Sequence, residues 1–581
     1  MNIFKKTLSV LLIFALNLIF LGNLAAEEYD IDDDEVLEEV SIATDIFSAA
    51  KKGDVYTIEE AINKKESINQ QDYLGNTPLI YACSKSKVDV VRVLLKKKAN
   101  VKIVNKDGVS PLMAACYAGS VDIVKMLLKE KIDVNLKDKT GSTALMYAAM
   151  NGNAEILTLL VEKKANPNIA NNIGATPLMV AVKNRNIDAV KFLLSNGASV
   201  NIEDRNKISA FFLAARNGDR DIMNYLVIAK ANINDANING VTPFIACAAC
   251  GNLDAVKYMV EMLKIDINSK DKQGNSALMA SVAFMYSDVI QNVLTDLKEL
   301  SALSESEYCD YVQNMKANSK EIMEYLVENG AYLNNANNKG MNTFMLAIEE
   351  NDIESANYLA EQGINVNQTD TNGNNALLLA AQSSNLNAVS YLLDLGLDVN
   401  SANNEGKTPL MYAIETGNFD MINLILDNKK TNIKVSDNNG KSALMYACEN
   451  GYIKVITDLI TKYSADINDI DTKGNTPLVY AVKSGNIPVV NILNSLGADK
   501  EIQNKQGYTA LDIAKTYKDE DHEEIVKILD GTRAAEAAAA LEAEKAAKEA
   551  EISAKKKAAA AAKKKAAAKK KAPVKKTVKK K

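Results

Sequence analysis

A short pattern recurs along this chain at nearly constant spacing, and it constrains the fold more than any other feature. Its clearest copy is GKTPLMYA at residues 406–413. Gly406 permits a turn with positive φ, Thr408 can cap a helix, and Pro409 suits the first helical position. Similar stretches begin at Gly75, Gly174 and Gly474. A turn and helix start repeated at fixed spacing predicts a stack of similar repeats.

The predicted turn positions follow one another at almost the same interval along the whole array. They are Gly75, Gly108, Gly141, Gly174, Lys207, Gly240, Gly274, Glu307, Gly340, Gly373, Gly406, Gly440, Gly474 and Gly507. Lys207 and Glu307 lack the glycine and are inferred from the register. Each repeat is expected to hold a turn, a helix, a short loop, a second helix and another loop. Many first helices end at a Gly eleven residues after the turn, which suits a left-handed C-terminal cap.

The stretch between Gly274 and Gly340 is two periods long, so it could hold two repeats, or one repeat with an insertion. Second-helix patterns follow Gly274 and Glu307 at the same distance, and Gly330 matches the glycines between other repeats. This register favours two repeats. Residues 307–339 are therefore predicted to be a degenerate but stacked repeat of low local stability. The array at residues 42–531 is then an all-α solenoid of about 15 helix-turn-helix repeats.

The 33-residue period and the Gly-x-Thr-Pro-Leu motif resemble the ankyrin-repeat family. The resemblance implies an ankyrin-repeat solenoid that binds partner proteins through its turn tips and the exposed side of its first helices. One departure is consistent, because the family has His after Pro-Leu where this chain has Met. These residues are Met113, Met146, Met179, Met411 and Met445. An apolar seam is expected to replace the polar bonding between repeats that His would supply.

The two ends of the chain differ from the array. Residues 1–26 combine a basic start, an apolar run and small residues before Glu27, which predicts a signal peptide and an exported protein. An uncleaved membrane anchor is the alternative, although the apolar run is short for a span. Residues 27–41 form an acidic leader that is predicted to be disordered. Residues 532–581 form an Ala/Glu/Lys-rich tail, expected to be a non-globular lone helix or a disordered coil.

Charge is unevenly distributed between the array and the tail. The net charge of −6 is the sum of +14 in residues 555–581 and −20 in residues 1–554. An acidic body with a basic tail indicates two different partners, or a tail that folds back.

Candidate catalytic and metal-binding residues are few. The only histidine, His522, has no nucleophile near it in sequence and is expected to face solvent. The cysteines are expected to be small core or surface thiols, because equivalent positions such as Cys83 and Cys116 should lie about 10 Å apart, beyond disulfide reach. Residues 235–240 match half of a calcium-binding loop, but its twelfth position is Ala246 instead of Glu. The sequence therefore predicts no enzyme, no catalytic residue, no cofactor, no metal and no small-molecule substrate.

In the resemblance, the partner-binding positions flank each turn glycine and lie nine or ten residues after it. Most are polar in this chain, as at Lys183, Arg216 and Glu415, but in the middle of the array they become apolar. The predicted partner-binding residues are Ile208, Ile238, Val241, Phe284, Met285 and Tyr308. A contiguous exposed apolar patch usually marks an interface. The alternative is that these side chains pack around the degenerate repeat.

These patterns together predict a non-enzymatic protein–protein interaction scaffold that binds a partner protein on the concave face of the array. Two alternatives remain. In the first, the Lys-rich tail binds an anionic envelope polymer or a lipid surface, and the protein is a surface adhesin or tether. In the second, residues 1–26 are not a signal and the chain binds nucleic acid, although no aromatic or Arg side chain lies among the tail lysines.

Overall fold

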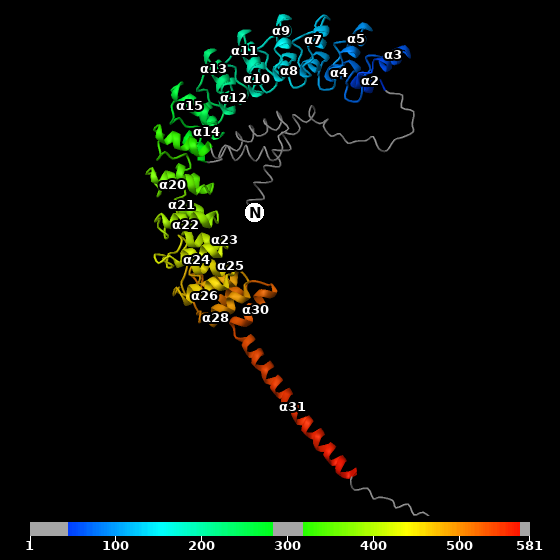
Figure 1. Ribbon diagram of the computed structural model, residues 1–581. Coiled ribbons are helices and arrows are strands. Elements are labelled where there is room, and N and C mark those ends of the chain that lie inside the picture. The colour runs from blue at the N-terminus through cyan, green and yellow to red at the C-terminus, as the bar shows by residue number, and fades with distance from the viewer. Residues whose placement is uncertain (1–44, 283–317, 570–581) are drawn as a thin grey trace, which may run out of the picture. The chain divides into compact units, whose positions relative to one another are not determined.

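The computed structural model describes residues 45–282 and 318–569 of the 581-residue chain. These residues belong to two compact parts, one ending at Asn172 and the other beginning at Ile173. Within each part, pairs of helices stack one after another in chain order (Figure 1). The described residues form no strand, only isolated bridges such as Glu203 with Ser209. The predicted all-α repeat architecture is therefore confirmed.

The N-terminal part holds four pairs of one first helix and one second helix. Its helices are α2 (Ile46–Lys52), α3 (Val55–Asn63), α4 (Pro78–Ser84), α5 (Val88–Lys96), α6 (Pro111–Tyr117), α7 (Val121–Leu127), α8 (Ala144–Asn151) and α9 (Ala154–Glu162).

The C-terminal part continues in the same order. Its helices are α10 (Pro177–Lys183), α11 (Ile187–Ser195), α12 (Ala210–Asn217), α13 (Arg220–Ile228), α14 (Pro243–Ala249), α15 (Leu253–Glu261), α16 (Ala277–Val282), α19 (Thr343–Glu349), α20 (Ile353–Glu361), α21 (Ala376–Gln382), α22 (Leu386–Asp394), α23 (Pro409–Thr416), α24 (Phe419–Asp427), α25 (Ala443–Asn450), α26 (Ile453–Thr461), α27 (Pro477–Lys483), α28 (Ile487–Ser495), α29 (Ala510–Ala514), α30 (Glu520–Leu529) and α31 (Thr532–Lys569). Residues 318–328 are helical as well.

The repeated motif forms the turn and the helix start that the sequence predicts. Gly406 has a φ of +79°, and Thr408 Oγ1 accepts the backbone N–H of Met411 at 3.4 Å. Lys207 has a φ of +58° at the equivalent position, which confirms the register inferred there without a glycine. The glycines that end first helices also adopt positive φ, as at Gly417 with +70°. Each repeat thus carries its own turn and capping residues.

Neighbouring repeats are joined at their turns by a recurring backbone hydrogen bond. The carbonyl before one turn glycine accepts the N–H two residues before the next, as Leu74 O does from Lys106 N at 2.9 Å. Side-chain amides add to this, since Asn105 Nδ2 donates to Asn76 Oδ1 at 3.0 Å. The five methionines predicted to form an apolar seam are all buried. The seam is therefore apolar, while asparagines keep polar bonds between repeats.

The prediction that residues 307–339 form a separate repeat is wrong for their described portion, residues 318–339. The turn at Gly274 is joined directly to the turn at Gly340, because Gln273 O accepts Asn338 N at 2.8 Å. This bond has the same register as the bond between every other described pair of neighbouring turns. Residues 318–328 are therefore the second helix of the repeat that begins at Gly274.

Contacts of this helix with the preceding repeat support the correction. Tyr325 Oη donates to Glu261 Oε1 of α15 at 3.1 Å, and Asn318 Nδ2 donates to Gly251 O at 3.1 Å. Residues 283–317, and with them 307–317 of the predicted repeat, lie outside the described residues. The array has one repeat fewer than predicted. The register misled because the extra chain between the two helices is close to one repeat period in length.

The ends of the chain are described in part. The predicted signal peptide at 1–26 and the acidic leader at 27–41 lie outside the described residues. The tail is helical as far as Lys569, and Arg533 Nε at its start pairs with Glu524 Oε1 of α30 at 3.0 Å. Of the helices described, none is at once long enough and apolar enough to cross a membrane.

Candidate partner-binding face

The turn tips and the exposed ends of the first helices form one surface in each part, which we call the first-helix face. An acidic or amide side chain three residues before the turn glycine organises it. Asp437 Oδ1 accepts the backbone N–H groups of Asn439 and Lys441, each at 2.8 Å, and Oδ2 accepts the hydroxyl of Tyr446 at 2.9 Å. Because Tyr446 lies on α25, this bond fixes the turn tip to the first helix.

The same tyrosine–carboxylate bond occurs in other repeats. Tyr147 Oη donates to Asp138 Oδ2 at 2.7 Å, and Tyr480 Oη donates to Asp471 Oδ2 at 2.9 Å. Burial raises the pKa of the Tyr446 hydroxyl above its ordinary value, and the nearby Asp437 carboxylate raises it further. These tyrosines are therefore uncharged hydrogen-bond donors that hold the turns in place.

Charged pairs cover the first-helix face in the repeats from Gly406 to Gly474. Lys407 Nζ lies 2.9 Å from Glu415 Oε1, and Lys441 pairs with Glu449 at the equivalent positions. Lys441 Nζ also lies 3.7 Å from the centre of the Tyr446 ring, a cation–π distance. This portion of the face is polar, as the sequence predicts.

In the N-terminal part the face becomes apolar. Tyr117 on α6 is 46% exposed and Met150 on α8 is 39% exposed, each nine residues after its turn glycine. The ring of Tyr117 meets that of Tyr147 edge-on with centroids 6.1 Å apart. Asn151 Nδ2 donates to Tyr117 O at 3.3 Å. Two apolar side chains are thus presented on adjacent, well-supported first helices.

Tyr117 and Met150 were not predicted from the sequence, although the rule used there identifies them. Both stand nine residues after a turn glycine, at Gly108 and Gly141, where two later repeats have glutamate. The change from polar to apolar was sought only in the middle of the array.

The structure separates the predicted partner-binding residues into three groups. Ile238 is 46% exposed at a turn tip, and Ile208 on the neighbouring turn is half-buried. Val241 is only 2% exposed, so the expectation that it faces a partner is wrong. Asn237 accepts Val241 N on Oδ1 at 3.1 Å and donates its backbone N–H to Val241 O at 3.0 Å, which closes the turn and leaves Val241 in the core. Phe284, Met285 and Tyr308 lie outside the described residues.

Two polar residues that were expected at the surface are buried instead. Arg216 on α12 is buried, and its carbonyl accepts Asn252 Nδ2 at 2.7 Å. His522 is also buried, with Nε2 2.8 Å from Val482 O and Nδ1 2.6 Å from Asp519 Oδ1. Its ring stacks on Tyr517 with centroids 4.0 Å apart. His522 therefore helps to join the last repeat to the preceding one.

The described cysteines are core residues without disulfide partners. They are Cys83, Cys116, Cys247, Cys250 and Cys448. Burial raises the pKa of the Cys250 thiol to about 12 and raises the pKa values of the other four as well. The described residues hold no group of three or more His, Cys, Asp or Glu that could bind a metal ion. These thiols suit packing and not nucleophilic chemistry.

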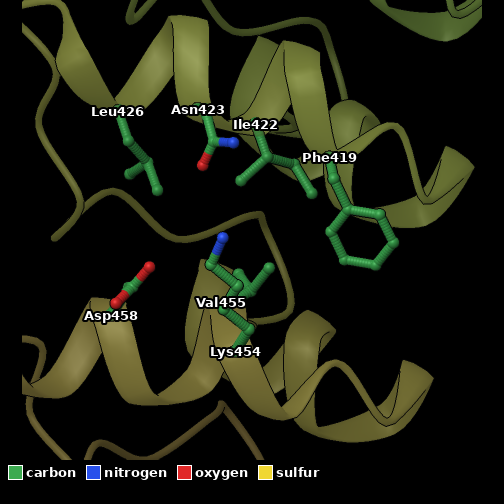
Figure 2. Close-up of a pocket in the computed structure, with 7 residues that line it drawn as sticks. All are labelled: Phe419, Ile422, Asn423, Leu426, Lys454, Val455 and Asp458. Carbon is green, nitrogen blue, oxygen red and sulfur yellow. The ribbon is translucent and has the colours of Figure 1, made fainter.

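Hollows at the surface are too small or too open to form an enclosed ligand site. One of about 70 Å³ lies between α24 and α26, where Phe419, Ile422 and Leu426 face Val455 and Asp458 (Figure 2). Ligand pockets usually measure about 300–1,000 Å³ and are lined mainly by apolar groups. A second hollow, of about 300 Å³, is lined by loop residues around Phe244 and is only at the lower limit of that range.

Stacked helix pairs with projecting turns define this chain as a helical-repeat interaction module. A family model described as ankyrin repeats in three copies matches residues 46–138, 130–204, 211–301, 313–370, 363–437, 398–471, 429–504 and 469–535. The chain belongs to the ankyrin-repeat family. Ankyrin repeats are generally protein–protein interaction modules, and the proteins built from them are typically non-enzymatic scaffolds. No curated protein matches the chain.

Proposed function

We propose that this protein is a non-enzymatic scaffold that binds a partner protein on its first-helix face, and that Tyr117 and Met150 are anchors of the contact. One observation carries the proposal: these two side chains are exposed on adjacent first helices, where later repeats carry paired charges. Tyr and Met are among the residue types enriched at protein interfaces. Lone exposed apolar residues need no explanation, but neighbouring ones on a binding face favour an interface.

The surroundings of Tyr117 suit an anchor. Its ring rests on Tyr147, whose hydroxyl is held by Asp138. A side chain that is already supported loses little freedom on binding, which reduces the free-energy cost of association. In the C-terminal part, the exposed Ile238 at a turn tip is a second proposed contact, with the half-buried Ile208 next to it.

Affinity measurements on single variants test the proposal. A partner purified with the full chain is titrated against Tyr117→Ala and Met150→Ala. Truncation of an interface anchor should weaken binding by about 2 kcal/mol, or about 30-fold. Tyr56→Ala is the matched control, because Tyr56 is a 77% exposed tyrosine on the second helix α3. Equal affinity of the Tyr117 and Tyr56 variants, with the fold intact, would place the partner elsewhere.

The tether and nucleic-acid alternatives remain predictions from the sequence. Binding to an anionic polymer or an anionic lipid vesicle that falls steeply with salt and disappears when residues 555–581 are removed would favour the tether. Binding to nucleic acid with the same salt dependence would favour the second alternative.

Export is likewise a proposal, and it rests on the sequence of residues 1–26 alone. Sequencing the N-terminus of the protein isolated from its native cells should give Glu27 if the signal is cleaved there. An intact Met1 on cytoplasmic protein would contradict it.

A further inference from the structure

Nine lysines form a row at the ends of the second helices in the N-terminal part, and we call this row the basic edge. Its members are Lys64, Lys65, Lys96, Lys97, Lys98, Lys129, Lys131, Lys163 and Lys164, all of them exposed. They lie at or just after the ends of α3, α5, α7 and α9, at the same place in four successive repeats. Among the described residues, only Lys64 pairs with a carboxylate, that of Glu60 at 2.7 Å. The edge is therefore a row of largely uncompensated positive charge.

The backbone indicates that these lysines are not there for stability. Lys65, Lys98 and Lys164 have φ values of 63°, 65° and 65°, in the left-handed region. At the equivalent position, several later repeats have glycine, as at Gly197 and Gly363. Left-handed backbone is unfavourable for lysine and not for glycine. Residues kept in an unfavourable backbone conformation at the surface are candidates for a function.

The same chain supplies a complementary segment next to this edge. Residues 27–39 contain nine Asp and Glu residues, and they precede α2 by a few residues. The helices α2 and α3 are joined only by Gly53 and Asp54, so they form an antiparallel pair. The start of α2 therefore lies at the same end of the pair as the end of α3, where the basic edge begins. The acidic segment enters the array beside the lysines.

The lengths agree as well. Neighbouring repeats pack about 10 Å apart, so the edge spans about 30 Å from its first repeat to its fourth. An extended peptide covers up to about 3.3–3.6 Å per residue, so residues 27–39 reach up to about 45 Å. Residues 40–44 add about 17 Å of connection to α2. The segment is long enough to run along all four repeats.

We propose that residues 27–39 lie along the basic edge as an acidic peptide ligand carried by the same chain. Each repeat then holds two or three carboxylates through its lysines. The bound segment covers the edge and competes with any external polyanion for it. The contact lies at the ends of the second helices and is separate from the partner-binding face.

Zero-length carbodiimide cross-linking of the full chain tests this proposal, since it joins only carboxylates and amines that are in contact. Mass spectrometry should find links from residues 27–39 to lysines of the basic edge within single chains. The links should be strong at low salt and largely lost at about 1 M salt, where charges are screened beyond about 3 Å. Links from residues 27–39 mainly to other lysines, or only between chains at high protein concentration, would overturn it.

A variant that keeps the fold makes the test specific. Replacing Lys65, Lys98 and Lys164 with glycine gives these positions the residue that other repeats carry. This change should weaken the contact about tenfold, the combined effect of losing three exposed charge pairs. The control replaces Lys230 and Lys264 with glycine, which removes left-handed lysines from the C-terminal part and should change nothing.

An external polyanion is the main competing occupant. Inorganic polyphosphate serves as the probe, with and without neutralisation of the acidic segment by Asn and Gln. The proposal predicts tighter polyphosphate binding once the segment is neutralised. Equal binding in both forms, without cross-links from residues 27–39, would mean that the edge serves an external ligand and that the proposal is wrong.

Discussion

Replacing Tyr446 with phenylalanine tests the bond that fixes each turn to its first helix. The change removes the hydroxyl that donates to Asp437 Oδ2 at 2.9 Å and keeps the ring, which Lys441 covers. Both Tyr446 and Asp437 are buried, so water cannot readily replace the lost donor. A hydrogen bond to a charged group contributes about 1.5–3 kcal/mol. The free energy of local opening should fall by about that amount.

Tyr412→Phe is the matched control, one repeat earlier at the same position. The Tyr412 hydroxyl is bonded to a neutral group, because Asn403 Nδ2 donates to it at 2.9 Å. A neutral hydrogen bond contributes about 0.5–1.5 kcal/mol. The control should therefore lose less stability than Tyr446→Phe.

Native-state hydrogen exchange is the appropriate assay, because a long repeat array need not unfold in one cooperative step. Peptides from residues 437–450 should lose about 10- to 150-fold in protection in Tyr446→Phe. Peptides around Tyr412 should lose about 2- to 10-fold in the control. Equal losses in the two variants would show that the charge of Asp437 does not stabilise the turn.

Three further predictions concern the rest of the array. Deleting residues 286–317 gives Gly274 and Gly340 the same spacing as Gly240 and Gly274, so exchange protection in α15 and α19 should not change, and its collapse would contradict a single repeat between these two turns. Hydrogen bonds, from His522 to Asp519 and within the turns at the other two, lower the pKa values of three carboxyls in the last repeat, Asp512, Asp519 and Asp530. Their stabilisation is present above the ordinary pKa of about 3.9 and is lost as pH falls through the lower folded values, so protection of α30 should drop below about pH 4, and less so in Asp519→Asn. The five buried thiols should resist iodoacetamide at pH 8 until the chain unfolds, and rapid labelling of Cys250 in the native protein would contradict its burial.

The repeat architecture was predictable because each repeat carries its own local determinants. The Thr408 cap, the positive φ of Gly406 and the buried methionine seam all depend on residues within one repeat. Such local signals recur often enough to fix the period. The polar bonds between repeats were not predicted, because Asn76 and Asn105 meet only once two repeats have stacked.

The errors arise where the outcome depends on distant residues. The pattern Glu321-Ile322-Met323 belongs to a real second helix, but only the bond between Gln273 and Asn338 shows which repeat it completes. His522 looks solvent-facing within its charged stretch, yet Val482, forty residues earlier, provides its buried partner. Val241 stands at a position that is exposed or half-buried in other turns, and it is buried here.

Site-specific photo-cross-linking in the native cells tests whether a partner protein binds the first-helix face. Benzoylphenylalanine is placed at Tyr117 or Met150 on that face, and at Tyr56 or Thr158 on exposed positions of the second helices α3 and α9. Positions 117 and 150 should capture the same protein, and positions 56 and 158 should not. Capture from the second-helix positions alone, or equally from all four, would mean that the partner does not bind the first-helix face.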